Sequence, residues 1–345
     1  MGHGCIAAHF SRVTLPSACV AERQILQCFA NAFTNDYMAA SSSDLGDAAR
    51  QGGMRLFLIS EKFDFPACQP LRIAARTTFL RASPPVSIFN NVLSDTRESS
   101  RIRWYKYASP QTFFPLAGKL IPWFAAIAVI LGVIGLYIGF FVAPTDFQQG
   151  DSYRIIFLHV PAAWMSMFIY LVMAFWAAIG LAFNTRMSSM MASALAPTGA
   201  MFTFLALWTG ALWGKPTWGA WWVWDARLTS ELILLFLYVG FMALQASIDE
   251  PRRADKAGAV LVLVGVINVP IIYFSVQWWN TLHQGASINL TSAPSMAMIM
   301  LLAMLIMALA SWAYTIAVTL VRVRCIVLER ERHTEWVKHY MEAKK

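Results

Sequence analysis

Two histidines and one tryptophan-rich segment are the residues whose types and spacing could bind a ligand. The segment WGKPTWGAWWVWDAR, from Trp213 to Arg227, holds five tryptophans within twelve residues. His159 stands in RIIFLHVPAAW and His283 in WWNTLHQG. A neutral imidazole is a common metal ligand, and an indole ring offers a large apolar surface with one polar N–H group. Whether these groups can act together depends on the elements that position them.

Long apolar runs determine the class of the fold. The chain has 345 residues, of which 58% are hydrophobic and 13% charged, whereas average proteins are about half apolar and a quarter charged. After position 120 the apolar residues gather in runs of about twenty, the length that a helix needs to cross a bilayer. Strands of a membrane barrel would instead give short alternating segments. The sequence therefore predicts an all-α integral membrane protein with a bundle of six transmembrane helices. The predicted spans are Ile121–Val142, Ile155–Phe183, Ala192–Trp213, Thr229–Ile248, Ala257–Val276 and Met296–Val321.

The basic residues beside these spans predict the orientation in the membrane. One side carries Arg101, Arg103, Lys106, Lys119, Arg186, Arg252, Arg253, Lys256, Arg322, Arg324, Arg330 and Arg332, and the other side carries only Arg154, Lys215 and Arg227. Both termini are therefore expected in the cytoplasm. The short tryptophan-rich loop between the third and fourth helices is expected on the outer face, which is the periplasmic face of the inner membrane in a Gram-negative cell. The same assignment places His159 and His283 on that face.

The remaining parts of the chain give a simple domain division. The net charge of +8 does not indicate nucleic-acid binding, because the basic residues flank the apolar runs. Residues 1–105 are mixed in polarity and contain no run long enough to span. We expect them to be an N-terminal extension that is either disordered or a misread start. Residues 106–325 form the predicted membrane domain, with the tryptophan segment at 213–227, and residues 326–345 form a cytoplasmic tail.

Two imidazoles that flank a broad aromatic surface suggest haem as the ligand. Haem is flat and largely apolar, and its iron accepts imidazole as an axial ligand. The indole rings would supply stacking area. The cations of the outer face, Lys215, Arg227 and Arg154, are candidates for pairing with the propionate carboxylates. Unpaired N–H groups at the start of the fourth helix could also face an anion.

Each of these features also has a structural explanation. Tryptophans at a membrane interface usually form an aromatic belt, although a belt seldom packs five of them into one short segment. A single histidine near the interface is more often structural, but two on one face favour a shared ligand. Asp225 is a candidate N-cap, which would stabilise its helix by about 1 kcal/mol. Trp278 and Trp279, just before His283, are either belt residues or a second wall of the pocket.

The sequence resembles a known family at these positions. The stretch WGKPTWGAWWVWD is similar to the tryptophan-rich signature of the haem-handling superfamily with WWD domains. The neighbouring segments APTDFQQGDSYRIIFLHVPAAW, ARLTSELILLFLYVG and YFSVQWWNTLHQG resemble the CcmC family, the haem-handling membrane subunits of cytochrome c maturation system I. The resemblance runs from about Tyr105 to Arg332. It implies that His159 and His283 are the axial ligands of the haem iron, and that a haem platform consists of Trp213, Trp218, Trp221, Trp222, Trp224 and Asp225.

The resemblance implies transfer of a ligand rather than catalysis. Proteins of the CcmC family hold a non-covalent b-type haem transiently and pass it to the membrane-anchored haem chaperone CcmE. The implied partners are CcmE, CcmD, the ABC subunits CcmA and CcmB, and membrane lipid. The chain contains no GxxxxGKS or GxxxxGKT loop, so it is not expected to hydrolyse ATP itself.

Two other functions remain open from the sequence. One is a haem exporter whose spans form the transmembrane path, and the other is a membrane b-type electron-transfer cytochrome. The spans contain few polar residues beyond Glu231, Asn268 and small hydroxyls, which argues against a polar path across the membrane.

Overall fold

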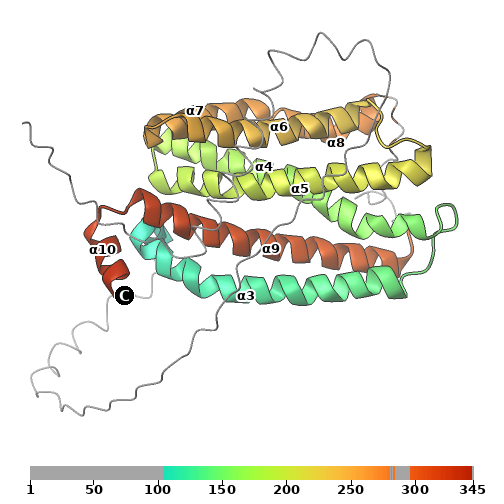
Figure 1. Ribbon diagram of the computed structural model, residues 1–345, viewed down its shortest axis with the longest axis horizontal. Helices are drawn as coiled ribbons and strands as arrows, with labels where there is room; N and C mark the ends of the chain where they lie inside the picture. Colours follow the sequence, from blue (N-terminus) through green and yellow to red (C-terminus); the bar gives the residue numbers. More distant parts are fainter. Residues whose placement is uncertain (1–103, 280, 282, 284–295, 344–345) are drawn as a thin grey trace, which may run out of the picture. The chain divides into compact units, whose positions relative to one another are not determined.

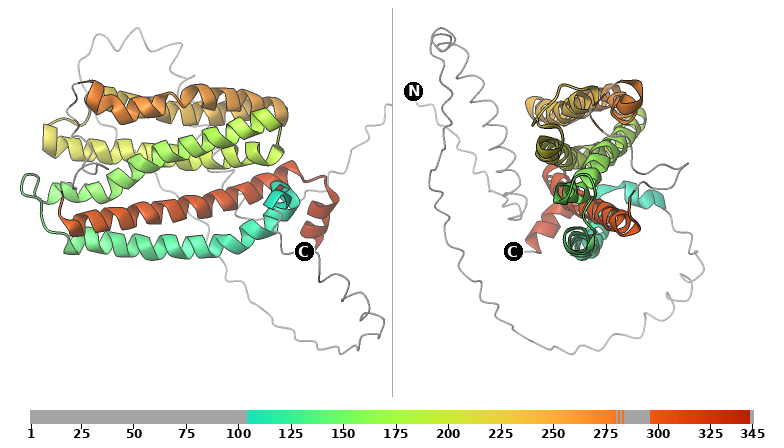
Figure 2. Two further views of the ribbon diagram at one scale, coloured as in Figure 1. Left: turned by 180° about the vertical axis from the view of Figure 1, so that it is seen from behind. Right: turned by 90° about the vertical axis from the view of Figure 1, so that its right-hand side faces the viewer.

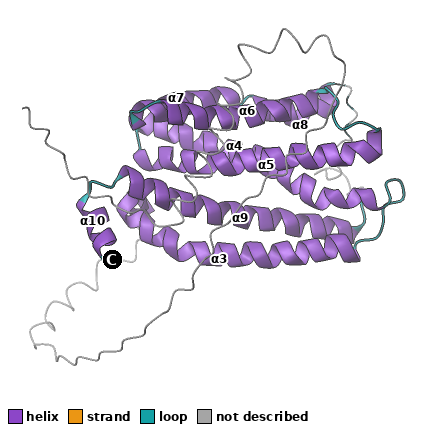
Figure 3. Cartoon of the chain, in the orientation of Figure 1, coloured by secondary structure: helices purple, strands orange, loops and turns teal. Residues whose placement is uncertain are grey.

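The described part of the chain is a bundle of helices. The computed structural model describes residues 104–279, 281, 283 and 296–343. Within these residues there is no β-strand, and Figure 3 shows helices joined by short loops. Six helical segments are long and apolar enough to cross a membrane, and they cover 110–142, 151–183, 186–218, 226–247, 251–278 and 298–330. The prediction of an all-α protein with six spans is therefore confirmed. The predicted extension, residues 1–105, lies almost entirely outside the described residues.

The helices follow one another with short connections. The elements are η2 (Trp104–Ala108), α3 (Pro110–Tyr137), η3 (Ile138–Val142), η4 (Asp151–Ile155), α4 (Ile156–Phe183), α5 (Arg186–Trp218), α6 (Ala226–Ser247), α7 (Pro251–Gly265), α8 (Asn268–Trp278), α9 (Met298–Arg330) and α10 (Glu335–Glu342). The helix α3 lies along α9, and α4 lies along α5, while α6 packs against α5, α7 and α8 (Figure 1). The predicted tail, residues 326–345, contains the end of α9 and the helix α10.

Several predicted spans differ from the structure in their ends or continuity. The first helix begins at Pro110 rather than Ile121, α5 begins at Arg186 rather than Ala192, and α9 continues to Arg330 rather than ending at Val321. The third span was predicted to end at Trp213, but α5 continues to Trp218. It ends there because Gly219 adopts a left-handed conformation with φ of 79° and donates its N–H to the Lys215 carbonyl at 3.1 Å. The fifth span is divided into α7 and α8, and the break precedes Pro270, whose ring removes one helical hydrogen bond.

The core of the bundle depends on close approach between α4, α5, α6 and α7. Tyr238 of α6 is fully buried, and its hydroxyl donates to the Ser166 carbonyl of α4 at 2.8 Å. Gly199 of α5 makes room for this ring, because a Cβ atom at that position would lie 2.1 Å from Tyr238 Cζ. Small residues at such contacts let membrane helices pack tightly.

The two ends of the bundle have separate hydrophobic clusters. At one end, which we call the α10 end, Phe114 of α3, Val327 of α9 and Val337 of α10 are buried together. At the other end, which we call the tryptophan end, Phe157 of α4 packs with Met300 of α9 and others, and the tryptophan segment lies beside them. The left view of Figure 2 shows α10 at one end of the bundle from behind. The larger group of basic residues counted in the sequence, as far as it is described, belongs to η2, the starts of α3, α5 and α7 and the end of α9, toward the α10 end. The smaller group, Arg154, Lys215 and Arg227, belongs to η4, the end of α5 and the start of α6, at the tryptophan end.

Candidate functional site

The two histidines singled out in the sequence lie next to each other at the tryptophan end. Their ring centroids are 6.3 Å apart, and the ring planes are inclined by 30°. His159 is buried near the start of α4, and His283 is half-buried in the connection after α8. Two metal–imidazole bonds of about 2 Å each, with roughly 1 Å from each nitrogen to its ring centre, give about 6 Å between ring centres. The separation therefore suits one metal ion held between the two rings.

A hydrogen bond orients the ring of His159. Its Nδ1 atom lies 3.0 Å from the hydroxyl oxygen of Thr209 on α5. That hydroxyl donates its single hydrogen to the Leu205 carbonyl at 2.6 Å, so its oxygen accepts from Nδ1–H of the histidine. The tautomer with the proton on Nδ1 leaves the lone pair on Nε2, which is the atom that can bind a metal. The ring also needs Gly210, since a Cβ atom there would lie 3.0 Å from His159 Cε1.

Two of the five tryptophans contact these histidines. The ring of Trp213 meets His159 edge to face, with centroids 5.6 Å apart and planes at 78°. The ring of Trp218 lies 6.0 Å from His283 with an inclination of 58°. Both tryptophans belong to the last turns of α5, and each contacts a different histidine. The continuation of α5 past its predicted end makes Trp218, which contacts His283, part of the helix.

The other three tryptophans form the outer part of the segment. Trp221 and Trp224 are 55% and 76% exposed. Trp222 meets Trp224 edge to face at 5.4 Å, and its buried indole N–H has no hydrogen-bond partner within the described part of the chain. The Oδ2 atom of Asp225 is also buried without a hydrogen-bond partner within the described residues. These rings and polar atoms are available to a ligand or to water, because a buried polar group without a partner is costly.

Asp225 begins α6 as an N-cap. Its Oδ1 atom accepts the backbone N–H of Leu228 at 2.7 Å, and the residue itself has an extended backbone. The predicted cap is therefore confirmed, and it uses only one of the two carboxylate oxygens.

The three candidate cations at this end have different surroundings. Lys215 donates to the Gly219 carbonyl at 3.1 Å and lies 6.0 Å from the centre of the Trp221 ring. The charge of Arg227, in the first turn of α6, interacts electrostatically with His159 and with Glu231. Both positions are on the tryptophan segment or at its end, so both side chains lie close to the histidine pair or to the outer tryptophans.

Arg154 instead serves the loop between the first two spans. Its Nε atom donates to Asp151 at 2.9 Å, and its Nη1 atom donates to the carbonyls of Gly139 and Ala143 at 2.9 and 3.2 Å. The side chain is only 18% exposed. These three hydrogen bonds hold the loop in place. Arg154 therefore has fewer N–H groups left for an anion than Arg227.

The comparisons with known proteins identify the family. Residues 103–338 match the family model described as heme exporter protein C. The chain belongs to this family, the CcmC family. The heme exporter protein C of Escherichia coli (strain K12) is 49% identical over 233 residues, which cover 68% of this chain and 94% of that protein. Those of Haemophilus influenzae and Bradyrhizobium diazoefficiens are 45% and 48% identical over 237 and 223 residues, covering 68% and 65% of this chain and 96% and 84% of theirs.

The CcmC match covers every candidate site residue. It begins at residue 103, so residues 1–102 of the expected extension 1–105 lie outside the matched range. The family resemblance selected the two histidines, the tryptophans and Asp225. It did not select Thr209, which lies fifty residues from His159 along the chain, or the adjacent Gly210.

A loop residue also escaped the sequence analysis. Gln149 accepts the indole N–H of Trp213 through its Oε1 atom at 2.7 Å. The loop that presents it is held by Asp146, whose Oδ1 atom accepts the backbone N–H groups of Gln148 and Gln149 at 2.9 and 2.8 Å. Aspartate and glycine are typical turn residues, and Asp146 and Gly150 in this short connection could have located the turn but not the contact with Trp213.

Trp278 and Trp279 stay outside the histidine cluster. They are 56% and 50% exposed at the end of α8. Trp278 stacks on Phe274 at 5.3 Å, and the two tryptophans meet each other at 5.8 Å. Among the described ring contacts, none joins either of them to His159 or His283, which favours their interpretation as belt residues.

Proposed function

We propose that this chain binds haem between His159 and His283 at the tryptophan end and delivers it to the haem chaperone CcmE during maturation of c-type cytochromes. Relatives that are 45–49% identical over 233–237 residues are named heme exporter protein C, which supports haem as the ligand. The observation that carries the proposal is the 6.3 Å separation of the two imidazole rings. When bound, the haem would supply an iron that both imidazoles can ligate.

The residues around the pair suit a flat anionic ligand. Trp213 and Trp218 flank the histidines and offer apolar surface. The buried indole N–H of Trp222 lacks a partner in the described residues, so a ligand can accept from it. Lys215 and Arg227 are the cations best placed for propionates, because most donors of Arg154 are used within the loop.

The position of the site favours release over permanent retention. His159 is at the start of a helix, and His283 is in a connection rather than inside a facing helix. The exposed rings of Trp221 and Trp224 form an apolar surface beside the site that a partner can cover. Because few basic residues flank the spans at this end, we assign it to the periplasmic face of the inner membrane. We also infer a non-catalytic subunit that assembles with CcmA, CcmB and CcmD.

The first test compares histidine variants in the purified full-length protein. We expect His159→Ala and His283→Ala each to lower the amount of co-purified haem or to change its absorption spectrum, and to stop the appearance of covalent haem on CcmE. His339→Ala on the α10 helix is the matched control, since that side chain is 77% exposed at the opposite end. Normal spectra and normal transfer in both site variants would refute the ligand assignment.

The names of the relatives keep the exporter as a second candidate. A path through the bundle would need polar groups that are free to interact with a moving ligand. The buried polar side chains instead hold helices together: Ser166 of α4 donates to Glu231 of α6 at 2.6 Å, and Asn268 of α8 donates to the Ser230 carbonyl at 2.8 Å. Haem movement across vesicles that contain this chain alone would favour the exporter. Retention of haem in the presence of CcmE would favour an electron-transfer cytochrome.

A further inference from the structure

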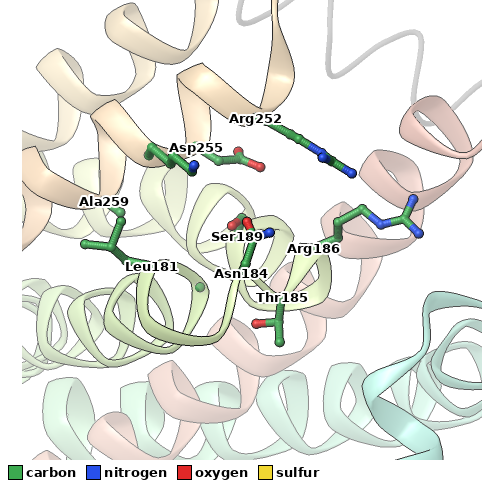
Figure 4. A pocket seen from close by; sticks show the side chains of 10 residues that line it. Leu181, Asn184, Thr185, Arg186, Ser189, Arg252, Asp255 and Ala259 are labelled. Atoms are coloured by element: carbon green, nitrogen blue, oxygen red, sulfur yellow. The ribbon is translucent and has the colours of Figure 1, made fainter.

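A basic pocket at the α10 end is separate from the haem site. It lies where the connection between α4 and α5 faces the first turns of α7 (Figure 4). Asn184 and Arg186 line it from the connection between α4 and α5 and from the start of α5. Arg252, Asp255 and Lys256 line it from α7. A smaller pocket adjoins it and extends between α4, α5, α6 and α7. None of these residues takes part in the proposed function of the tryptophan end.

The charges in this pocket are strongly unbalanced. Its lining contains three cationic side chains, Arg186, Arg252 and Lys256, and one carboxylate, Asp255. Both oxygens of Asp255 are already bound by Arg330 of α9, at 2.7 and 2.9 Å. This bidentate pair neutralises the one acidic group of the lining. Arg186 pairs with Glu331, which does not line the pocket, at 3.6 Å. Arg252 and Lys256 therefore have no lining carboxylate left to pair with.

Two of these cations repel each other within α7. Arg252 and Lys256 are four residues apart, so they lie on the same face of the helix, and like charges at this spacing are destabilising. Neither forms an ion pair in the described part of the chain, whereas the adjacent Arg253 pairs with Glu250 at 2.6 Å. Figure 4 shows the side chains of Arg186 and Arg252 extending toward the same side of the pocket. Cations that only oriented the protein in the membrane would not need to converge in this way.

The surroundings of the pocket indicate the kind of anion. Leu181 and Phe183 at the end of α4 are 41% and 74% exposed, and Val260 on α7 is 52% exposed. In a membrane protein such side chains face lipid tails. We propose that the pocket binds a phosphate group carried by an anionic phospholipid, with the acyl chains beside Leu181 and Val260. A free phosphate ion shares the head-group chemistry but cannot use the apolar edge.

The test measures lipid retention by native mass spectrometry of the full-length protein in detergent. The probes are dioleoylphosphatidylglycerol, dioleoylphosphatidylcholine and inorganic phosphate. We expect wild-type protein to retain the anionic lipid, and Arg252→Gln/Lys256→Gln to retain it at least roughly tenfold more weakly, because each basic residue adds to such binding. Arg253→Gln is the matched control: it removes one charge from the same turn of α7 but not from the pocket. Because that charge is already paired with Glu250 at 2.6 Å, the loss of retention should stay below the roughly fivefold expected for one unpaired cation at the membrane surface.

Each outcome decides the proposal. Loss of phosphatidylglycerol in the double variant, with retention in Arg253→Gln, supports the lipid site. Binding of inorganic phosphate alone, with the same dependence on Arg252 and Lys256, keeps the phosphate chemistry but assigns it to a soluble ion. Equal retention of phosphatidylcholine, or equal loss in Arg253→Gln, overturns the proposal. If the double variant cannot be purified, Lys256→Gln alone should give the same direction with a smaller loss.

Discussion

The Nδ1 atom of His159 and the hydroxyl oxygen of Thr209 lie 3.0 Å apart inside the bundle, and both side chains are buried. Because the hydroxyl hydrogen is used on the Leu205 carbonyl, Thr209 acts on the histidine as an acceptor. This contact fixes the tautomer and the direction of Nε2. Thr209 is therefore a positioning residue, since it acts through His159 rather than on the ligand.

Replacing Thr209 by valine should weaken haem binding without removing a ligand. The change keeps the size and branching of the side chain but removes the hydroxyl that accepts from Nδ1–H of a buried histidine. Loss of such outer partners typically lowers metal affinity by about 10- to 100-fold. Haem titration of the purified apoprotein measures the affinity, and the absorption spectrum reports on ligation. Thr209→Ser should restore both.

The matched control for this prediction is Thr203→Val on the same helix. Thr203 is fully buried, and its hydroxyl donates to the Gly199 carbonyl at 2.8 Å, as Thr209 donates to a carbonyl one turn back. The control therefore removes the same kind of bond but no contact with a histidine. Equal haem affinities in the two valine variants would show that Thr209 has only a structural role.

The hydrogen bond between Gln149 and Trp213 gives a second prediction. Gln149→Ala should free the indole N–H of Trp213, at a cost of about 1 kcal/mol in stability, and loosen the ring that contacts His159. Thermal unfolding in detergent and the haem spectrum measure the two effects. Gln148→Ala is the control, because Gln148 is exposed and uses only its backbone N–H on Asp146. The same change in both variants would contradict a specific role for Gln149.

Sequence patterns predicted the features of this molecule that depend on local composition. Apolar runs of membrane length predicted six spans, and Asp225 before an apolar run predicted the N-cap of α6. The continuation of α5 through Pro216 was not predicted, because proline and glycine in that stretch are typical of a loop. The structure shows that the helix instead ends at Gly219, whose positive φ a glycine accommodates easily.

The contacts that orient the candidate site could not be predicted in the same way. Thr209 and His159 are fifty positions apart, and Trp213 and Gln149 are 64 positions apart. Their pairing depends on how α4, α5 and the loop before η4 are placed side by side. No periodicity within one segment carries that information, so threonine and glutamine at these positions looked like ordinary helix and loop residues.

Asp225 allows a third prediction that separates its cap from any contact with the ligand. Asp225→Asn keeps an oxygen that can accept from Leu228 N–H, so the stability of the protein should change by less than about 0.5 kcal/mol, while Asp225→Ala should lose about 1 kcal/mol. The free Oδ2 atom is what the asparagine variant alters chemically. If haem affinity falls in Asp225→Asn although thermal unfolding is unchanged, the second oxygen acts on the ligand. If haem affinity and thermal unfolding both change in Asp225→Ala and neither changes in Asp225→Asn, Asp225 is purely structural.

The final prediction concerns the close approach of α5 and α6. Gly199→Ala would place a methyl group 2.1 Å from Cζ of Tyr238, a ring that is fully buried and tied to α4 through its hydroxyl. Since the ring cannot move without breaking that bond, we expect a loss of about 1–3 kcal/mol, seen as a lower unfolding temperature in detergent. Gly240→Ala is the matched control on α6, where the nearest atom, Leu261 Cδ2, is 3.9 Å away. Because alanine favours helix over glycine, the control should be neutral or slightly stabilising. A Gly199→Ala protein of equal stability would show that α5 and α6 are packed less closely than in the structure.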